Sequence, residues 1–277
     1  MSNNIEFPTG KGHISFSEIK CWKECTWRHK LMHIDKIDIG DTSPYLYFGT
    51  CAHAGIENFL ETGSTDAERL LDNFRSDWNK NGFSDPEWIS RQPGWYKSKP
   101  VDEWCQWAQN MWNDIPSFLD ETFPGWKIHK AEEMLYESIH DKNLNFKGFI
   151  DAVFEVPDKK GDIKYWIIDW KTAPKYGWRR DKKQDILMTS QLILYKYFWA
   201  LKYNIPLKDI RCGFVLLKRE AKPGKICELV TVSVGPKSLS RALKILNNMI
   251  SSVRKSMFLK NRNSCRFCQF KDTEYCT

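Results

Sequence analysis

The sequence has no apolar run of the roughly eighteen residues that a membrane span needs. Its first residues, MSNNIEFPTGKGH, contain no apolar segment like that of a secretory signal. We therefore expect a soluble, cytoplasmic protein that has no membrane partner. A glycine-rich phosphate loop of the Walker type is also missing, because the Lys-Pro-Gly-Lys run at 222–225 lacks the required glycine spacing. The chain is not expected to be an ATPase or helicase by itself.

Disulfide bonds are a poor explanation for the nine cysteines, since the count is odd and no export signal is present. Metal ligation is the better question for those near the two ends. Four others lie within apolar patterns, where a free cysteine usually behaves as a small buried hydrophobe, and we assign them no function: Cys51, Cys105, Cys212 and Cys227.

Charge favours a polyanionic partner without choosing between DNA and RNA. The 42 Lys and Arg residues exceed the 35 Asp and Glu residues, which gives a formal net charge of +7. A mildly basic soluble protein without such a partner fits the charge equally well.

Hydrophobic periodicity predicts an α/β protein with a small mixed β-sheet flanked by helices. Helical patterns dominate residues 1–125, and Ser15 with Glu18 has the spacing of a capping box at the first helix. Short segments rich in β-branched and aromatic residues follow at 131–139, 146–156, 163–170, 211–217 and 226–234, with helical patterns at 187–201 and 239–253. We predict one elaborated domain, 1–277, with a helical part (1–125), a sheet core (126–235) and a C-terminal helix with a cysteine cluster (236–277).

Two acids and a lysine near the ends of predicted strands could form a catalytic centre. Asp169 and Lys171 are two residues apart, so a strand directs both side chains to one side of the sheet. Asp151 lies in the preceding predicted strand, and its carboxylate comes close to Asp169 and Lys171 if the two strands are neighbours. Carboxylates bind hard cations such as Mg²⁺, and an ammonium group can orient a water molecule and stabilise charge on a phosphate. A surface ion pair beside an unrelated aspartate explains either motif alone.

Further residues, in a fixed chain order, change that balance. Their order is Gly49 with His53, Gly148 with Asp151, Asp169 with Lys171, and Gln191 with Tyr195, the last pair lying one helical turn apart. This order resembles the RecB-like branch of the PD-(D/E)XK nuclease superfamily, and it extends over about half of the chain. The resemblance implies a restriction-endonuclease-like core.

The resemblance also implies a role for each of these residues. His53, Asp151, Asp169 and the backbone carbonyl of Trp170 would hold Mg²⁺ or Mn²⁺, and Lys171 would serve hydrolysis. Gln191 and Tyr195 would help to place the nucleic acid. The sequence departs from the family's pattern at Trp170, where an acid often stands, but the family tolerates an apolar residue there.

The last segment holds three closely spaced thiols, Cys265, Cys268 and Cys276, which suit a soft metal or a cluster. In the same branch, RecB-like, AddB-like and CRISPR-associated exonucleases bind a [4Fe-4S] cluster through one early and three terminal cysteines. By that resemblance Cys25 supplies the fourth ligand, with Cys21, one turn away, as the alternative. Four thiolates also suit Zn²⁺, and the spacing alone does not exclude it.

A basic loop with interleaved aromatic residues follows the predicted catalytic strand. It runs from Lys175 to Lys183 and includes Trp178, Arg179 and Arg180. Phosphate contact and base stacking would use such residues, although a solvated charged loop is an equally good explanation of the loop alone.

We therefore predict a metal-dependent DNA nuclease, specifically an exonuclease that hydrolyses phosphodiester bonds from DNA ends or in single strands. The relatives place it in recombination, repair or phage replication, and they leave room for a helicase or recombination partner. A non-catalytic DNA-binding or assembly subunit that keeps the nuclease fold is the alternative.

Overall fold

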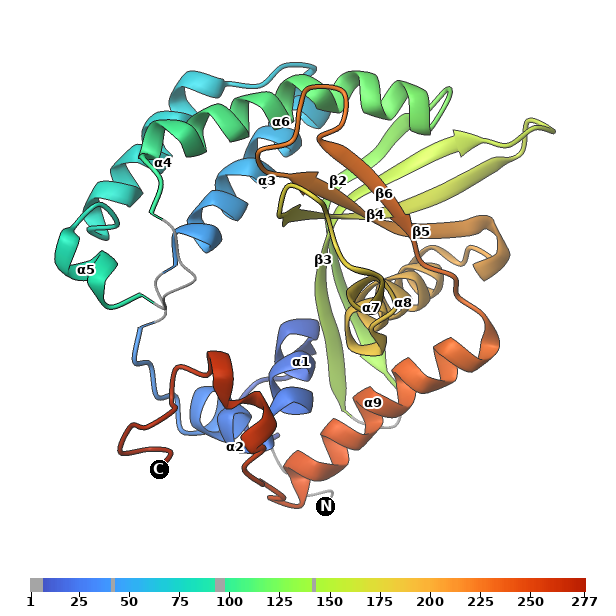
Figure 1. The fold of residues 1–277 in the computed structure, drawn as a ribbon. Coiled ribbons are helices and arrows are strands. Elements are labelled where there is room, and N and C mark those ends of the chain that lie inside the picture. Colours follow the sequence, from blue (N-terminus) through green and yellow to red (C-terminus); the bar gives the residue numbers. More distant parts are fainter. Residues whose placement is uncertain (1–6, 41–42, 93–97, 141–142) are drawn as a thin grey trace.

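The structure is a computed structural model that describes residues 7–40, 43–92, 98–140 and 143–277. A six-stranded sheet lies between two groups of helices (Figure 1). The strands are β1 (His13–Ser15), β2 (Lys127–Ile139), β3 (Leu144–Pro157), β4 (Ile163–Ala173), β5 (Ile210–Lys218) and β6 (Cys227–Thr231). The α-helices are α1 (Phe16–Glu24), α2 (Thr26–His29), α3 (Pro44–Thr62), α4 (Ala67–Lys80), α5 (Pro86–Ser90), α6 (Val101–Thr122), α7 (Arg180–Lys183), α8 (Ile186–Tyr203) and α9 (Pro236–Arg254). Shorter helical turns are η1 (Lys30–Ile34), η2 (Leu207–Asp209) and η3 (Arg262–Phe267).

The sheet is mixed, as the sequence predicted. Strands β2, β3 and β4 form an antiparallel meander, β4 pairs with β5 in parallel, and β6 is antiparallel to β5. A parallel pair needs a crossover, and α8 lies in the connection from β4 to β5. Strand β3 has β2 along one edge, while its other edge pairs first with β1 and then with β4. The α/β fold class is thus confirmed.

Alternate residues of the inner strands face two different hydrophobic clusters. In β5, Phe214 and Leu216 belong to one cluster, while Val215 and Leu217 belong to the other. Because successive side chains of a strand point to opposite faces, the clusters lie on opposite sides of the sheet. Helices α1, α8 and α9 cover one face, and α3, α4 and α6 cover the other (Figure 1).

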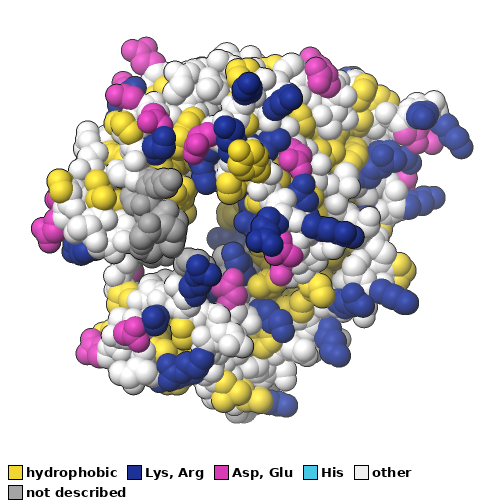
Figure 2. All heavy atoms as spheres, in the orientation of Figure 1, with side chains coloured by type: hydrophobic (Ala, Val, Ile, Leu, Met, Phe, Trp, Pro, Cys, Tyr) yellow, Lys and Arg dark blue, Asp and Glu magenta, His cyan; other side chains and the backbone are white. Residues whose placement is uncertain are grey.

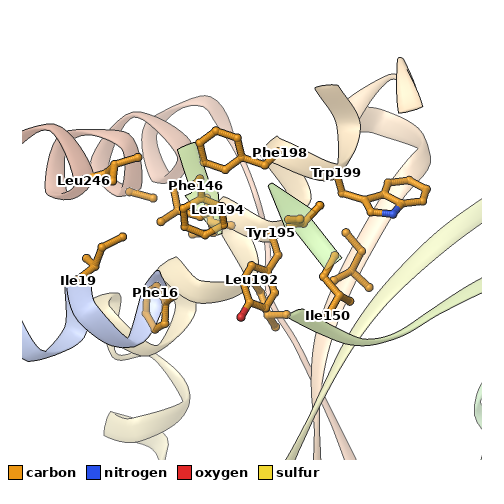
Figure 3. Close-up of a cluster of buried hydrophobic side chains, with 14 of the residues drawn as sticks. Phe16, Ile19, Phe146, Ile150, Leu192, Leu194, Tyr195, Phe198, Trp199 and Leu246 are labelled. Carbon is orange, nitrogen blue, oxygen red and sulfur yellow. The ribbon is translucent and has the colours of Figure 1, made fainter. Parts of the chain in front are cut away.

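The first cluster binds α1 and α9 to the crossover helix. Figure 3 shows side chains of α1, α8 and α9 gathered over Phe146 of β3, among them Phe16, Ile19, Tyr195, Phe198 and Leu246. The rings of Phe146 and Phe198 stack with their centroids 4.4 Å apart. This packing fixes the position of α8 relative to β3 and β4, which carry the candidate catalytic residues.

Part of the sheet is covered on one face only. Leu135, Phe146 and Ile150 are buried in the first cluster, yet Tyr136 and Phe149 between them are each 46 % exposed. The described helices α3 and α6 instead pack over the end of the sheet that holds Ala152 and Phe154, and similar residues of β4 and β5. One half of β3 is therefore sandwiched, and the other half has an open face.

The start of α1 differs slightly from its prediction. The Ser15 hydroxyl accepts a hydrogen bond from the Glu18 amide at 3.3 Å, as expected of an N-cap. The Glu18 carboxylate does not return to Ser15; it lies 3.0 Å from Nε2 of His29 inside the protein. The buried imidazole competes for this carboxylate, so only one half of the capping box forms.

The end of the chain lies against α2. The Trp27 amide donates to the Leu259 carbonyl, and the Trp27 indole donates to the Tyr275 carbonyl, both at 3.1 Å. A small cluster of Leu31, Phe270 and Cys276 closes this contact. Within the described ranges, no helix is both long enough and apolar enough to cross a membrane.

Candidate active site

Strand β4 brings a carboxylate and an ammonium group into direct contact. Asp169 and Lys171 share one side of the strand, and the Lys171 ammonium lies 2.5 Å from Oδ2 of Asp169. Both side chains lie on the face of the sheet that α8 covers. The period of two predicted this adjacency.

The neighbouring strand supplies a second carboxylate. Oδ2 of Asp151, on β3, accepts a hydrogen bond from the backbone amide of Trp170 at 2.6 Å. Because Trp170 lies between Asp169 and Lys171, this bond holds the two acids beside each other. The prediction that the two strands are neighbours is confirmed.

Helix α3 contributes the imidazole. Nδ1 of His53 lies 3.5 Å from Oδ2 of Asp151. Burial and then the positive charge of Lys171 lower the pKa of His53 to about 4, although a backbone hydrogen bond to Trp170 acts in the opposite direction. His53 is therefore neutral at pH 7, which is the form that can ligate a metal.

The two acids are a costly pair without a cation. Burial, together with the charge of Asp169, raises the pKa of Asp151 well above its usual value, and burial also raises the pKa of Asp169. Burial opposes the charge of Lys171, but the two carboxylates outweigh it and raise its pKa. One ammonium thus faces two carboxylates.

One oxygen of this pair suits a cation in particular. Oδ2 of Asp169 is buried and forms no hydrogen bond of normal geometry, and its close contact is the Lys171 ammonium. The donor set of one imidazole and two carboxylates is what Mg²⁺ or Mn²⁺ accepts. In their present positions, no three His, Cys, Asp or Glu side chains of the described residues already lie close enough to enclose a metal ion.

Helix α8 fixes the position of the central acid. The Gln191 amide donates to Oδ1 of Asp169 at 2.7 Å and lies 3.3 Å from the Tyr195 hydroxyl. Tyr195 is buried against β3 at Gly148, where an added Cβ would lie 2.7 Å from the tyrosine ring. The glycine is therefore explained by this close approach. The predicted contact of Gln191 and Tyr195 with nucleic acid stays a prediction.

A pocket of about 690 Å³ opens beside Lys171. Side chains from β1, α1, β3, β4 and α8 line it, including four lysines, and none of its described lining residues is acidic. Figure 2 shows that the molecule is hollowed near its centre and that Lys and Arg side chains gather around this hollow. The candidate catalytic group thus borders a cationic cavity.

Comparison with known proteins was made with this geometry established. The family model of the PD-(D/E)XK nuclease superfamily matches residues 13–274. The chain belongs to this superfamily. The match includes β1 to β6 and each of the residues that resemble the family's motifs.

One solved structure shares the fold of this superfamily member. A crystal structure from Eubacterium rectale named "putative exonuclease" has 14 % identity and a TM-score of 0.56, with 97 % of this chain and 91 % of that chain covered. A structure of a protein named SSO0001 has 14 % identity over 92 % of each chain, but its TM-score is 0.32 and it carries no argument. A search of curated proteins found no match.

The basic loop of this PD-(D/E)XK superfamily member contains one buried aromatic residue, Trp178. Only 6 % of Trp178 is exposed; its ring packs 5.2 Å from that of Phe214, and Nζ of Lys182 lies 4.6 Å above it. Trp178 is therefore buried between Phe214 and Lys182, yet it also lines the pocket beside Lys171, and its contact with nucleic acid stays a prediction. Arg179 and Arg180 are exposed, and their contact with nucleic acid stays a prediction.

Two acids near the site were missed by sequence reasoning. Glu132 lies between Ala131 and Glu133, which pair with Ala152 and Ile150 on either side of Asp151, and it has a left-handed φ of 46°. Burial and then the charge of Glu57, with Asp169 next, raise the pKa of Glu132. Glu57 is one helical turn after His53, so its spacing on α3 was a signal that could have placed it near the site.

Cys25 lies in a segment that contacts the C-terminal segment with Cys265, Cys268 and Cys276. Sγ of Cys25 is 3.4 Å from the Asn261 amide, and Sγ of Cys265 is 3.8 Å from the Asn261 carbonyl. Cys268 and Cys276 contact the small cluster around Phe270. The segments therefore suit a shared site, although the thiols as placed do not form a metal-binding group among the described residues. Cys51, Cys105 and Cys212 are buried and Cys227 is half-buried, as predicted for residues that pack in the core.

Proposed function

We propose that the protein is a metal-dependent nuclease that hydrolyses phosphodiester bonds in DNA. The observation that carries this proposal is the contact of the Lys171 ammonium with Asp169, beside a second acid, Asp151, that is bonded to the amide between them. Family membership supports the same chemistry.

Each residue has a role that its position can support. His53, Asp151, Asp169 and the backbone carbonyl of Trp170 would hold Mg²⁺ or Mn²⁺, which polarises the scissile phosphate and lowers the pKa of a bound water molecule. Lys171 orients the attacking water and balances the negative charge that builds on the phosphate.

The residues of α8 act through Asp169. Gln191 donates a hydrogen bond to Oδ1 of Asp169, which leaves Oδ2 of Asp169 for Lys171 and for the cation. Arg179, Arg180 and the cationic pocket would contact the DNA backbone.

The finer assignment rests on the order of the motifs. We infer an exonuclease of the RecB-like branch that acts on DNA ends or single strands in recombination, repair or phage replication, in cooperation with a helicase or recombination protein. We also infer that residues 1–277 act as one nuclease domain, because both hydrophobic clusters share the same sheet. The alternative, a non-catalytic DNA-binding subunit, is weakened by the complete set of catalytic side chains.

A digestion assay tests this proposal. Labelled linear DNA, single- or double-stranded, and RNA are incubated with Mg²⁺ or Mn²⁺ and with wild type, Asp169→Asn or Lys171→Gln. Each change should slow DNA hydrolysis by about 100-fold or more. Lys160→Gln, on the exposed turn between β3 and β4, is the matched control and should cut like wild type.

The outcomes separate the alternatives. Equal cutting by all variants removes the proposed centre, and binding without cutting by wild type favours the non-catalytic subunit. A circular single strand distinguishes the mode of attack, because an exonuclease leaves it intact.

We further propose a [4Fe-4S] cluster on Cys25, Cys265, Cys268 and Cys276, with Zn²⁺ as the alternative. The meeting of α2 with the C-terminal segment supports it, and such a cluster would hold these distant segments together. Iron, sulfide and zinc are measured on anaerobically purified protein. Cys265→Ser should lose the metal and Cys227→Ser should keep it; a metal-free wild type, or one that holds only zinc, overturns the cluster.

A further inference from the structure

An exposed aromatic face lies beside the candidate active site. It consists of Met134 and Tyr136 on β2 and Phe149 on β3, and their exposed fractions are 50 %, 46 % and 46 %. Met134 pairs with Phe149 in the antiparallel register, so the two side chains are neighbours. Exposed apolar side chains that lie together on one sheet face are a feature of interaction sites.

The charged residues that line the pocket beside this face are lysines, and no described acid lines it. Lys20, Lys147, Lys171 and Lys182 line the same pocket as Phe149. Of these, Lys171 has Asp169 as partner, while the other three form no ion pair with any described acid. Burial, followed by the charges of Lys20 and Lys171, lowers the pKa of Lys182. Uncompensated cations that crowd one cavity predict an anionic ligand.

Rings and cations follow one strand away from the proposed reaction centre. Phe149 precedes Asp151 by two residues and Lys147 precedes it by four, which places their backbones about 7 and 13 Å along β3 from that acid. Nζ of Lys147 lies 5.7 Å from the Phe149 ring centroid. An aromatic ring and an ammonium group thus follow one another along β3 towards Asp151.

We propose that this face, together with Lys20, Lys147 and Lys182, is a subsite for a single strand of nucleic acid. A base of the strand stacks on Phe149, with Tyr136 as the next surface, and the flanking phosphates lie against the three lysines. Bases within a duplex are stacked on their neighbours and present no free face to Phe149, so the subsite selects unpaired nucleotides. This inference rests on the proposed function, and it adds the substrate class.

The test measures binding without cleavage. Asp169→Asn protein, without divalent cation, is titrated into labelled oligothymidylate of about 16 nucleotides, the matching duplex, and an abasic strand of equal length. The subsite predicts tighter binding to oligothymidylate than to the other two ligands. Equal affinity for the normal and abasic strands overturns the stacking proposal, and preference for the duplex overturns the single-strand class.

Two variants at one exposed position isolate the ring. On the same background, Phe149→Leu keeps an apolar side chain but should weaken binding to oligothymidylate about ten-fold, while abasic binding stays constant. Phe149→Tyr should bind as Phe149 does. If the leucine variant binds as tightly as its parent, the face is an apolar contact of another kind and the proposal is wrong.

The lysines are tested through the salt dependence of binding. Changing Lys20, Lys147 and Lys182 together to Gln should flatten the slope of log affinity against log salt by about 2, because each phosphate contact on a single strand contributes about 0.7. The control is Lys159→Gln with Lys160→Gln, two lysines on the distant β3–β4 turn, and its slope should not change. An unchanged slope in the triple variant removes the lysines from the subsite.

These measurements fail independently of the nuclease proposal. If wild type does not cut DNA but Phe149→Leu still loses binding to the normal strand, the subsite stands and the catalytic proposal falls. If wild type cuts but Phe149→Leu binds normally, the reverse holds.

Discussion

The two halves of strand β3 differ in what covers them. Residues 152–157 lie between helices on both faces, and Ala152 and Phe154 are fully buried. Residues 144–150 pack against α8 on one face, no helix of the described residues covers the other face, and Phe149 is half exposed there. The same strand therefore serves as core at one end and as surface at the other.

The proposed catalytic acid lies where these halves meet. Asp151 lies between exposed Phe149 and buried Ala152. On the neighbouring strand β2, Glu132 has a left-handed backbone, which costs about 1 kcal/mol or more. The side chains packed on both faces of the sheet beyond Asp151 support this acid from one side, and the exposed residues around Phe149 adjoin it on the other. The fold thus places the carboxylate of Asp151 at the edge of the hydrophobic core.

The largest effect is expected within the sandwiched half. Phe154 packs its ring against those of Phe123 and Trp126, with centroids 5.6 and 5.2 Å away. Phe154→Ala should lower the free energy of unfolding by about 3–5 kcal/mol, because it removes a buried ring and leaves a cavity. Urea denaturation measures it. A loss below about 1 kcal/mol would show that this half of β3 is not tightly packed.

An intermediate effect is expected at the contact between β3 and α8. Gly148→Ala places a Cβ about 2.7 Å from the Tyr195 ring, so we expect a loss of about 1–3 kcal/mol as the ring shifts. Gly49→Ala is the matched control: it lies inside α3 with nothing near the added Cβ, and should stabilise the helix by about 0.5–1 kcal/mol. Thermal unfolding of both variants checks the pair, and equal changes would contradict the packing at Tyr195.

The smallest effect is expected on the open face. Phe149→Leu should change the free energy of unfolding by less than about 0.5 kcal/mol, because the ring already contacts solvent. Urea denaturation beside Phe154→Leu, the same change in the sandwiched half, makes the contrast direct. Similar losses of unfolding free energy in the two variants would mean that Phe149 is part of the core and is not an exposed binding residue.

Sequence reasoning was strongest where one element carries its own pattern. The period of two placed Asp169 beside Lys171, and the helical period placed Gln191 beside Tyr195, because both relations depend only on local backbone geometry. The same patterns located strands β2 to β6 and helices α1, α8 and α9, and they indicated that residues 1–125 are mainly helical. Strand β1 was missed, since His13–Ser15 is too short to show a period and pairs with β3 far along the chain.

Prediction was weaker where burial decides the role of a side chain. Trp178 stands in a basic loop whose composition suggests contact with nucleic acid, yet packing against Phe214 buries it. Phe149 stands in an ordinary strand pattern, yet no described helix covers it. Composition cannot rank these two aromatic residues, because exposure depends on elements that are distant in sequence.

The sequence alone determined the strand and helix periods, the motif order that resembles one nuclease superfamily, and the acid and lysine that share one side of β4. Only the tertiary structure decided that His53 reaches Asp151, that Gln191 holds Asp169, and that Phe149 and four lysines line one pocket. The physical reason is range. A backbone period acts over a few residues, whereas burial, charge and reach are set by segments that meet only when the chain packs.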